Sequence, residues 1–89
     1  MTDDALSAPA CRAARGLLEW SVRDLCAAAG VSPNTVGRLE AGSGIGPEPT
    51  ARISGAFTEH GVELLGDDRP GARVGDPERF AQSVAAKRT

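Results

Sequence analysis

The sequence predicts a single, mainly helical domain, and three observations lead to this prediction. The chain has 89 residues, which is enough for one hydrophobic core and too few for two. Aromatic residues make up only 3% of the chain and alanine is frequent, which suits closely packed helices. Helix-capping residues and glycines recur at the intervals expected of short helices. We therefore expect a compact four-helix domain, followed by a short β-hairpin and a C-terminal segment.

The first two helices are predicted from apolar spacing and from capping residues. Residues 8–18 carry alanines and leucines at spacings of three and four, which predicts an amphipathic helix. A second helix begins after Ser21, whose side chain is placed to cap it while Asp24 completes a capping box. It ends at Gly30, the residue type expected just past a helix C-terminus.

The third helix repeats this pattern. Ser32 is placed to cap it, and Pro33 occupies its first position, where a missing N–H has no cost. The helix is predicted over residues 33–41 and ends at Gly42. The glycine- and proline-rich stretch 42–49 is predicted to be a loop, because neither residue type favours a continuing helix.

The remaining residues predict one more helix, a hairpin and a terminal segment. Thr50 is placed to cap a fourth helix over residues 51–60. Two short β-compatible runs, 62–65 and 72–74, are separated by turn-forming residues and are expected to pair as a hairpin. A helix-start pattern of acid, proline and acid opens the segment 75–89, which is expected to be either a short docked helix or a frayed tail.

The composition excludes several classes of protein. No stretch approaches the roughly 20 apolar residues needed to cross a bilayer, which excludes membrane insertion. The polar leader 1–7 lacks the apolar run of a secretion signal, so Cys11 and Cys26 are expected to be reduced thiols in a cytoplasmic protein. These two cysteines and the single His60 do not supply a zinc site or a catalytic set. We expect no enzyme activity, no metal and no cofactor.

The charge balance is unfavourable for a protein that binds nucleic acid. The formal net charge is -2, whereas Lys and Arg supply most of the affinity for phosphates. Carboxylates are concentrated in the predicted tails and loops, at Asp3, Asp4, Asp67, Asp68, Asp76 and Glu78. A locally basic face on the helices is therefore compatible with the sequence.

The second and third helices are joined by the tight turn Gly30-Val31-Ser32, as in a helix-turn-helix. Gly30 can supply the positive φ of the turn, and Cys26 is small enough to let the helices approach. The turn glycine, the serine cap, a Thr-Val pair and a Leu-Glu-x-Gly ending occur together in residues 21–42 (SVRDLCAAAGVSPNTVGRLEAG). Through these residues the chain resembles the Cro/CI-type (XRE-like) helix-turn-helix regulators, over residues 10–65.

The resemblance implies that the third helix reads DNA in the major groove. The residues implied to contact DNA are Ser21, Arg23, Ser32, Pro33, Asn34, Thr35 and Arg38. Asn34 can pair with an adenine edge, and Arg38 with guanine or a phosphate. Arg23, with the amides at the start of the second helix, is placed to meet phosphates. The resemblance also implies a structural ion pair between Arg15 and Glu40.

Simpler interpretations of these residues stay open. Ser21 and Ser32 act as helix caps with or without DNA, and Asn34 and Arg38 are also compatible with an ordinary solvated helix face. Arg15 and Glu40 are expected to matter for folding, because breaking a buried ion pair leaves an uncompensated charge.

These inferences predict a DNA-binding domain over residues 8–65, with 62–74 as a hairpin or dimerisation element. The predicted function is a sequence-specific transcriptional repressor that binds double-stranded DNA as a homodimer, with two third helices about 34 Å apart. The alternative, favoured by the acidic balance, is a protein-interaction module built on the same fold, such as an antitoxin or an adaptor.

Overall fold

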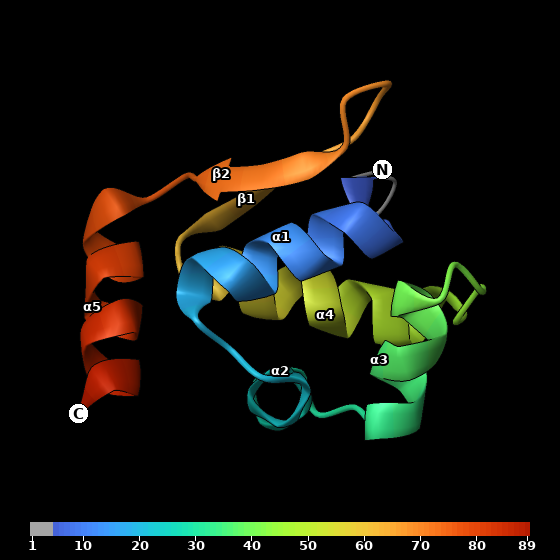
Figure 1. Cartoon of the computed structure of the whole chain (residues 1–89), viewed down its shortest axis with the longest axis horizontal. Coiled ribbons are helices and arrows are strands. Elements are labelled where there is room, and N and C mark those ends of the chain that lie inside the picture. The colour runs from blue at the N-terminus through green and yellow to red at the C-terminus, as the bar shows by residue number, and fades with distance from the viewer. Residues whose placement is uncertain (1–4) are drawn as a thin grey trace.

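The computed structural model describes residues 5–89, so part of the predicted polar leader, residues 1–4, lies outside the described residues. The predicted mainly helical fold is confirmed (Figure 1). In chain order the elements are α1 (Ala8–Leu18), α2 (Val22–Ala29), α3 (Pro33–Glu40), α4 (Pro47–Glu59), β1 (Val62–Leu65), β2 (Gly71–Val74) and α5 (Pro77–Arg88).

The caps predicted for the second and third helices are present. The Ser21 hydroxyl oxygen accepts the Asp24 amide at 3.1 Å, and the Asp24 carboxylate accepts the Ser21 amide at 2.8 Å, which completes the capping box of α2. Ser32 caps α3 by accepting the Thr35 amide at 3.2 Å. Gly30 ends α2 with φ at 71°, a left-handed conformation that favours glycine. Local sequence therefore determines both ends of α2 and the start of α3.

The fourth helix begins earlier than predicted. α4 starts at Pro47, and Gly46 precedes it without a side-chain cap. The prediction that Thr50 caps this helix was wrong, because Thr50 lies in the first turn and its hydroxyl donates to the Gly46 carbonyl at 2.7 Å. The prediction that residues 42–49 are entirely loop was also wrong. Prolines in a first turn lack only N–H groups that have no helical partner there, so they do not delay the helix.

The core lies between α1, α4 and the hairpin, and α2 and α3 close one end of it. Figure 1 shows the hairpin lying along α1, where β2 packs on α1 and β1 packs on both α1 and α4. The largest fully buried side chains are Phe57, Leu18, Leu25, Ile53, Val36, Val62 and Cys11. Cys26 is only half-buried against this cluster. The core therefore holds α2 and α3 through a few aliphatic residues.

The hairpin and the terminal helix complete the fold. β1 and β2 pair antiparallel, with Val62 opposite Val74 and Leu65 opposite Gly71, which confirms the hairpin. The terminal segment is a helix, one of the two outcomes the sequence left open. The Asp76 side chain caps it by accepting the Arg79 amide at 3.2 Å.

The position of α5 depends on a close backbone approach at Gly61. This residue has φ at 83°, and a Cβ placed on it would lie 2.5 Å from the Phe80 nitrogen and 2.6 Å from the Asp76 carbonyl oxygen. The Gly61 carbonyl also accepts the amides of Gly75 and Asp76, at 2.8 and 3.1 Å. Glycine is therefore required here both for the turn and for the docking of α5.

Candidate nucleic-acid interface

α2, a three-residue turn and α3 form a compact unit at one end of the molecule. The amides of Gly30 and Val31 both donate to the Cys26 carbonyl, at 2.8 and 3.2 Å, which fixes the turn. Val36 and Leu39 are buried and hold α3 on the core. The opposite face of α3 is therefore directed toward solvent.

The residues predicted to contact DNA lie together on this unit. Ser32, Pro33, Asn34 and Arg38 are exposed, and Thr35 is half-buried. The hydroxyl oxygens of Ser32 and Thr35 lie 2.9 Å apart and share a hydrogen bond. Asn34, Thr35 and Arg38 line a shallow hollow with the loop residues Gly44, Ile45 and Gly46. At the start of α2, Ser21 and Arg23 are exposed as well.

The carboxylates and the cations of this unit differ in whether they form ion pairs. α2 and α3 contain two cations, Arg23 and Arg38, and two carboxylates, Asp24 and Glu40. Both carboxylates are paired with cations from other helices, Glu40 with Arg15 at 2.8 Å and Asp24 with Lys87 at 2.7 Å. Among residues 5–89, no carboxylate pairs with Arg23 or Arg38. The net charge of the whole chain therefore does not describe this surface.

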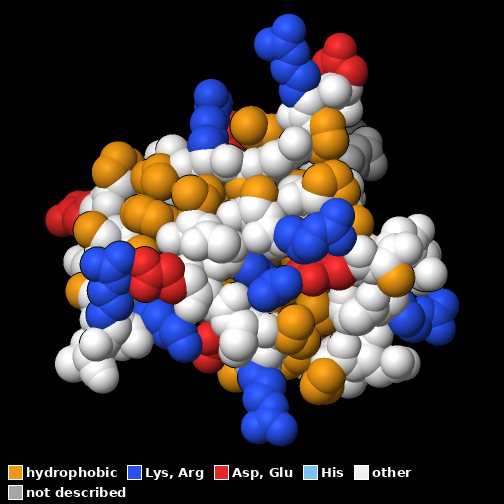
Figure 2. Space-filling model, in the orientation of Figure 1, with side chains coloured by type: hydrophobic (Ala, Val, Ile, Leu, Met, Phe, Trp, Pro, Cys, Tyr) orange, Lys and Arg blue, Asp and Glu red, His pale blue; other side chains and the backbone are white. Residues whose placement is uncertain are grey.

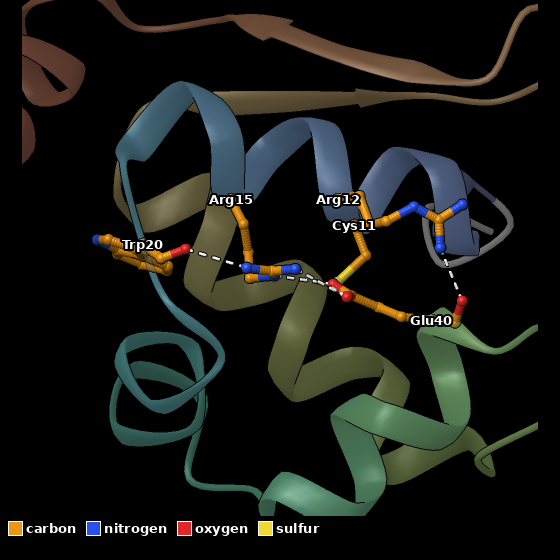
Figure 3. A network of polar contacts seen from close by, with 5 residues as sticks. All are labelled: Cys11, Arg12, Arg15, Trp20 and Glu40. Carbon is orange, nitrogen blue, oxygen red and sulfur yellow. Dashed lines mark hydrogen bonds and ion pairs between the residues drawn. The ribbon is translucent and has the colours of Figure 1, made fainter.

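Arg15 and Glu40 form a two-pronged ion pair between α1 and the end of α3 (Figure 3). The Arg15 Nε and Nη2 atoms donate to the two Glu40 carboxylate oxygens, each at 2.8 Å, and Nη1 donates to the Trp20 carbonyl at 3.1 Å. The Cys11 thiol donates to Glu40 Oε2 at 3.1 Å, and Arg12 donates to the Glu40 carbonyl at 2.7 Å. We call these five residues the clamp, since they fasten α3 to α1.

Ionisation reinforces the clamp. Burial raises the pKa of the Cys11 thiol to about 12, and the hydrogen bond to Glu40 and its negative charge act in the same direction. Burial also acts to raise the pKa of Glu40, but the hydrogen bonds from Arg15 and Cys11, with the charges of Arg15 and Arg12, outweigh it and lower the pKa. Glu40 is therefore held as an anion and Cys11 as a neutral donor.

Sequence reasoning missed several residues near this unit. Arg52 of α4 donates to the Gly30 carbonyl at 3.1 Å and pairs with Glu48 at 2.8 Å. The spacing of Glu48 and Arg52 indicates a pair along one helix, but not the approach of Arg52 to the turn. Cys11 and Lys87 were missed because their partners are distant in sequence. Each of these contacts becomes visible only in the fold.

Within the part of the chain that the structure describes, no group of three His, Cys, Asp or Glu side chains is placed to hold a metal ion. None of the helices in residues 5–89 is long and apolar enough to cross a membrane.

Comparison with known proteins decides the family. The sequence pattern of a helix-turn-helix family matches residues 12–57, which is just over half of the chain. The chain belongs to this Cro/CI-type helix-turn-helix family. A search of curated proteins and a search of solved structures gave no match. The general class of this helix-turn-helix protein is thus that of DNA-binding regulators. Its hairpin and α5 lie outside the matched residues.

Proposed function

We propose that this helix-turn-helix protein is a sequence-specific transcriptional repressor that reads the major groove of double-stranded DNA with α3. The observation that carries the proposal is the exposed face of α3, where Asn34 and Arg38 lie one turn apart. An asparagine can make two hydrogen bonds to adenine and an arginine two to guanine. Each such contact discriminates against a wrong base by about 1–3 kcal/mol.

The residues around α3 are suited to contact the phosphate backbone. Arg23 is exposed at the start of α2, and within residues 5–89 no carboxylate neutralises it. Ser32 and Thr35 share one hydrogen bond, which uses one of their two hydroxyl hydrogens and leaves the other for a phosphate oxygen. Ser21 is exposed at the start of α2, where it caps the helix by accepting the Asp24 amide. Pro33 is the first residue of α3, directly after the cap Ser32, and its ring favours the backbone conformation in which the helix starts. These contacts supply register and affinity, and the base contacts supply specificity.

We infer that the repressor acts as a homodimer. A single unit with few phosphate contacts binds weakly, and two copies of α3 about 34 Å apart match successive turns of the major groove. Each strand of the described hairpin has one neighbour only, so each has an edge without a partner strand, and such edges are suited to pairing with a second copy. A dimer that occupies an operator blocks other proteins by occupancy alone, which is repression.

The test is selection of bound duplexes from a random pool at two salt concentrations. Wild-type protein is expected to enrich an inverted repeat and to bind it more tightly at low salt. Arg38→Ala should lose the enrichment, whereas the control Arg79→Ala, whose side chain pairs with the α5 cap Asp76, should keep it. If no sequence is enriched at either salt concentration, the proposal fails, and a protein partner of the antitoxin or adaptor kind becomes the better hypothesis.

A further inference from the structure

The C-terminal helix brings a cation to the helix-turn-helix unit from outside the family pattern. Lys87 Nζ lies 2.7 Å from the Asp24 carboxylate, in the first turn of α2. About a third of each side chain is exposed, 38% for Lys87 and 33% for Asp24. Asp24 directly follows Arg23, one of the residues proposed to meet a phosphate. The Asp24 carboxylate also accepts the amide of Ser21 at 2.8 Å, so the pair adjoins a second residue proposed to contact DNA.

The backbone and side chains of α5 hold Lys87 in this position. The start of the helix rests on Gly61, and its middle is tied to the core by the Ser83 hydroxyl, 2.7 Å from His60 Nδ1. The His60 ring in turn contacts Trp20 edge-on, with ring centroids 4.8 Å apart. At its end, Arg88 pairs with Glu19. Lys87 is thus held in place by a docked helix and does not belong to a free tail.

The docking of α5 determines which charges are neutralised on one face of the molecule. Figure 2 shows basic and acidic side chains side by side across this face. α2 and α3 carry two carboxylates, and Arg15 of the clamp neutralises Glu40. Asp24 is the other, and Lys87 is the cation that neutralises it. Without Lys87, the Asp24 charge would cancel much of the field of Arg23 and would repel a phosphate placed beside it.

We propose that the DNA-binding surface of this protein extends onto the last turn of α5, where Lys87 neutralises Asp24 beside the phosphate backbone. The proposal rests on the proposed function, because it deepens the same interaction with DNA. Its partner is therefore the sugar-phosphate backbone of a duplex. The hydrogen bond from Lys87 lowers the pKa of Asp24 to about 2, with the Ser21 amide acting in the same direction. Asp24 is consequently an anion at neutral pH, and its charge beside a phosphate needs compensation.

The test measures binding of a fluorescent duplex carrying the enriched site, by anisotropy, at about 50 and about 200 mM salt. Lys87→Met removes the charge and keeps most of the length of the side chain. It should weaken binding about fivefold at the lower salt, which is the size expected of one exposed unit charge a few ångströms away. The loss should shrink at the higher salt, because exposed charges are screened there. Arg79→Met removes a cation from the other end of α5 and should bind like wild type.

A second variant separates charge from structure. In Asp24→Asn with Lys87→Met, the uncompensated carboxylate is gone, and the asparagine oxygen still accepts the Ser21 amide. Binding should return to the wild-type level. If Lys87→Met acted by releasing α5, the added Asp24→Asn change would not restore binding, and that result would overturn the proposal.

The remaining outcomes separate this inference from the proposed function. Equal binding by Lys87→Met and wild type at both salt concentrations, with Arg38→Ala inactive, overturns the role of α5 and leaves α3 as the reader of DNA. Equal losses in Lys87→Met and Arg79→Met also overturn it, since the effect would not depend on Asp24. Absence of binding by the wild-type protein to any duplex overturns the proposed function itself.

Discussion

Two regions of this protein fasten distant segments with ion pairs, and they differ mainly in burial. In the clamp, Arg15 and Glu40 join α1 to α3 with side chains that are 20% and 14% exposed. The second region is the C-terminal end of α5 with its two ion pairs, Arg88 with Glu19 and Lys87 with Asp24, which we call the α5 junction. There, the Arg88 and Glu19 side chains are 66% and 40% exposed. Figure 3 shows the clamp carboxylate with donors on more than one side, whereas the α5 pairs lie on the surface.

The difference shows what an ion pair can do in each setting. A half-buried pair whose other polar groups are also hydrogen-bonded is costly to break, because the remaining partner stays desolvated. An exposed pair contributes little to stability, since water solvates either partner alone. Its charges still act on their surroundings over a few ångströms. The clamp therefore acts mainly on stability, and the α5 junction acts mainly through the charges on its surface.

The largest effect is expected from Glu40→Ala. This change removes the acceptor of Arg15 and of the Cys11 thiol at once, so the free energy of unfolding should fall by about 3 kcal/mol. Urea unfolding followed by Trp20 fluorescence measures it. Glu63→Gln, which breaks the exposed pair with Arg73, is the matched control and should change stability little. Equal losses in the two variants would show that burial is not what distinguishes the regions.

Gly61→Ala should separate the two regions physically. The added Cβ would overlap the backbone of Phe80 and Asp76, so α5 should undock while the clamp stays intact. With the positive φ, the cost should be about 1–2 kcal/mol. Hydrogen exchange should show loss of protection in α5 alone. Gly55→Ala, where a Cβ meets nothing within 4 Å, is the control. Unchanged protection of α5 in Gly61→Ala would contradict the docking described above.

The sequence predicted those parts of the fold that depend on neighbouring residues. The capping box of α2 involves residues three apart, and the turn at Gly30 needs only a left-handed residue, so both can be read locally. The start of α4 was mispredicted because Thr50 is a good cap by type, while the prolines before it are equally good first-turn residues. Local preference does not decide between two such starts.

Long-range contacts in the candidate site had no comparable signal. The resemblance to a family supplied the Arg15 and Glu40 pair, but Cys11 in the same clamp looks like one more small residue of an alanine-rich helix. The role of Gly61 in docking α5 follows only from the packing of the two segments. Lys87 and Asp24 lie too far apart in sequence for any periodicity to join them.

Within the clamp, thiol reactivity provides a finer test. Cys11 is fully buried, and its pKa is raised to about 12, so at pH 8 very little reactive thiolate is present. Iodoacetamide should modify the half-buried Cys26 well before Cys11, as measured by mass spectrometry of peptides. The stabilising effect of the neutral Cys11 thiol is complete below the ordinary thiol pKa and is lost as pH rises through about 12. Equal modification rates of the two cysteines would contradict the packing of the clamp.

At the α5 junction, the corresponding test is titration of Asp24, for which we expect the smallest effect. Its pKa is lowered to about 2, first by the Lys87 hydrogen bond and then by the Ser21 amide. Because the folded-state pKa is below the unfolded one, the stabilisation is present above the unfolded value and is lost as pH falls through about 2. NMR titration of the Asp24 carboxyl carbon should give this midpoint, and Lys87→Met should move it back toward the ordinary range, with Arg79→Met as the unchanged control. A midpoint insensitive to Lys87→Met would mean that capping by Ser21 alone sets the charge of Asp24, and the junction would then lose the electrostatic role that separates it from the clamp.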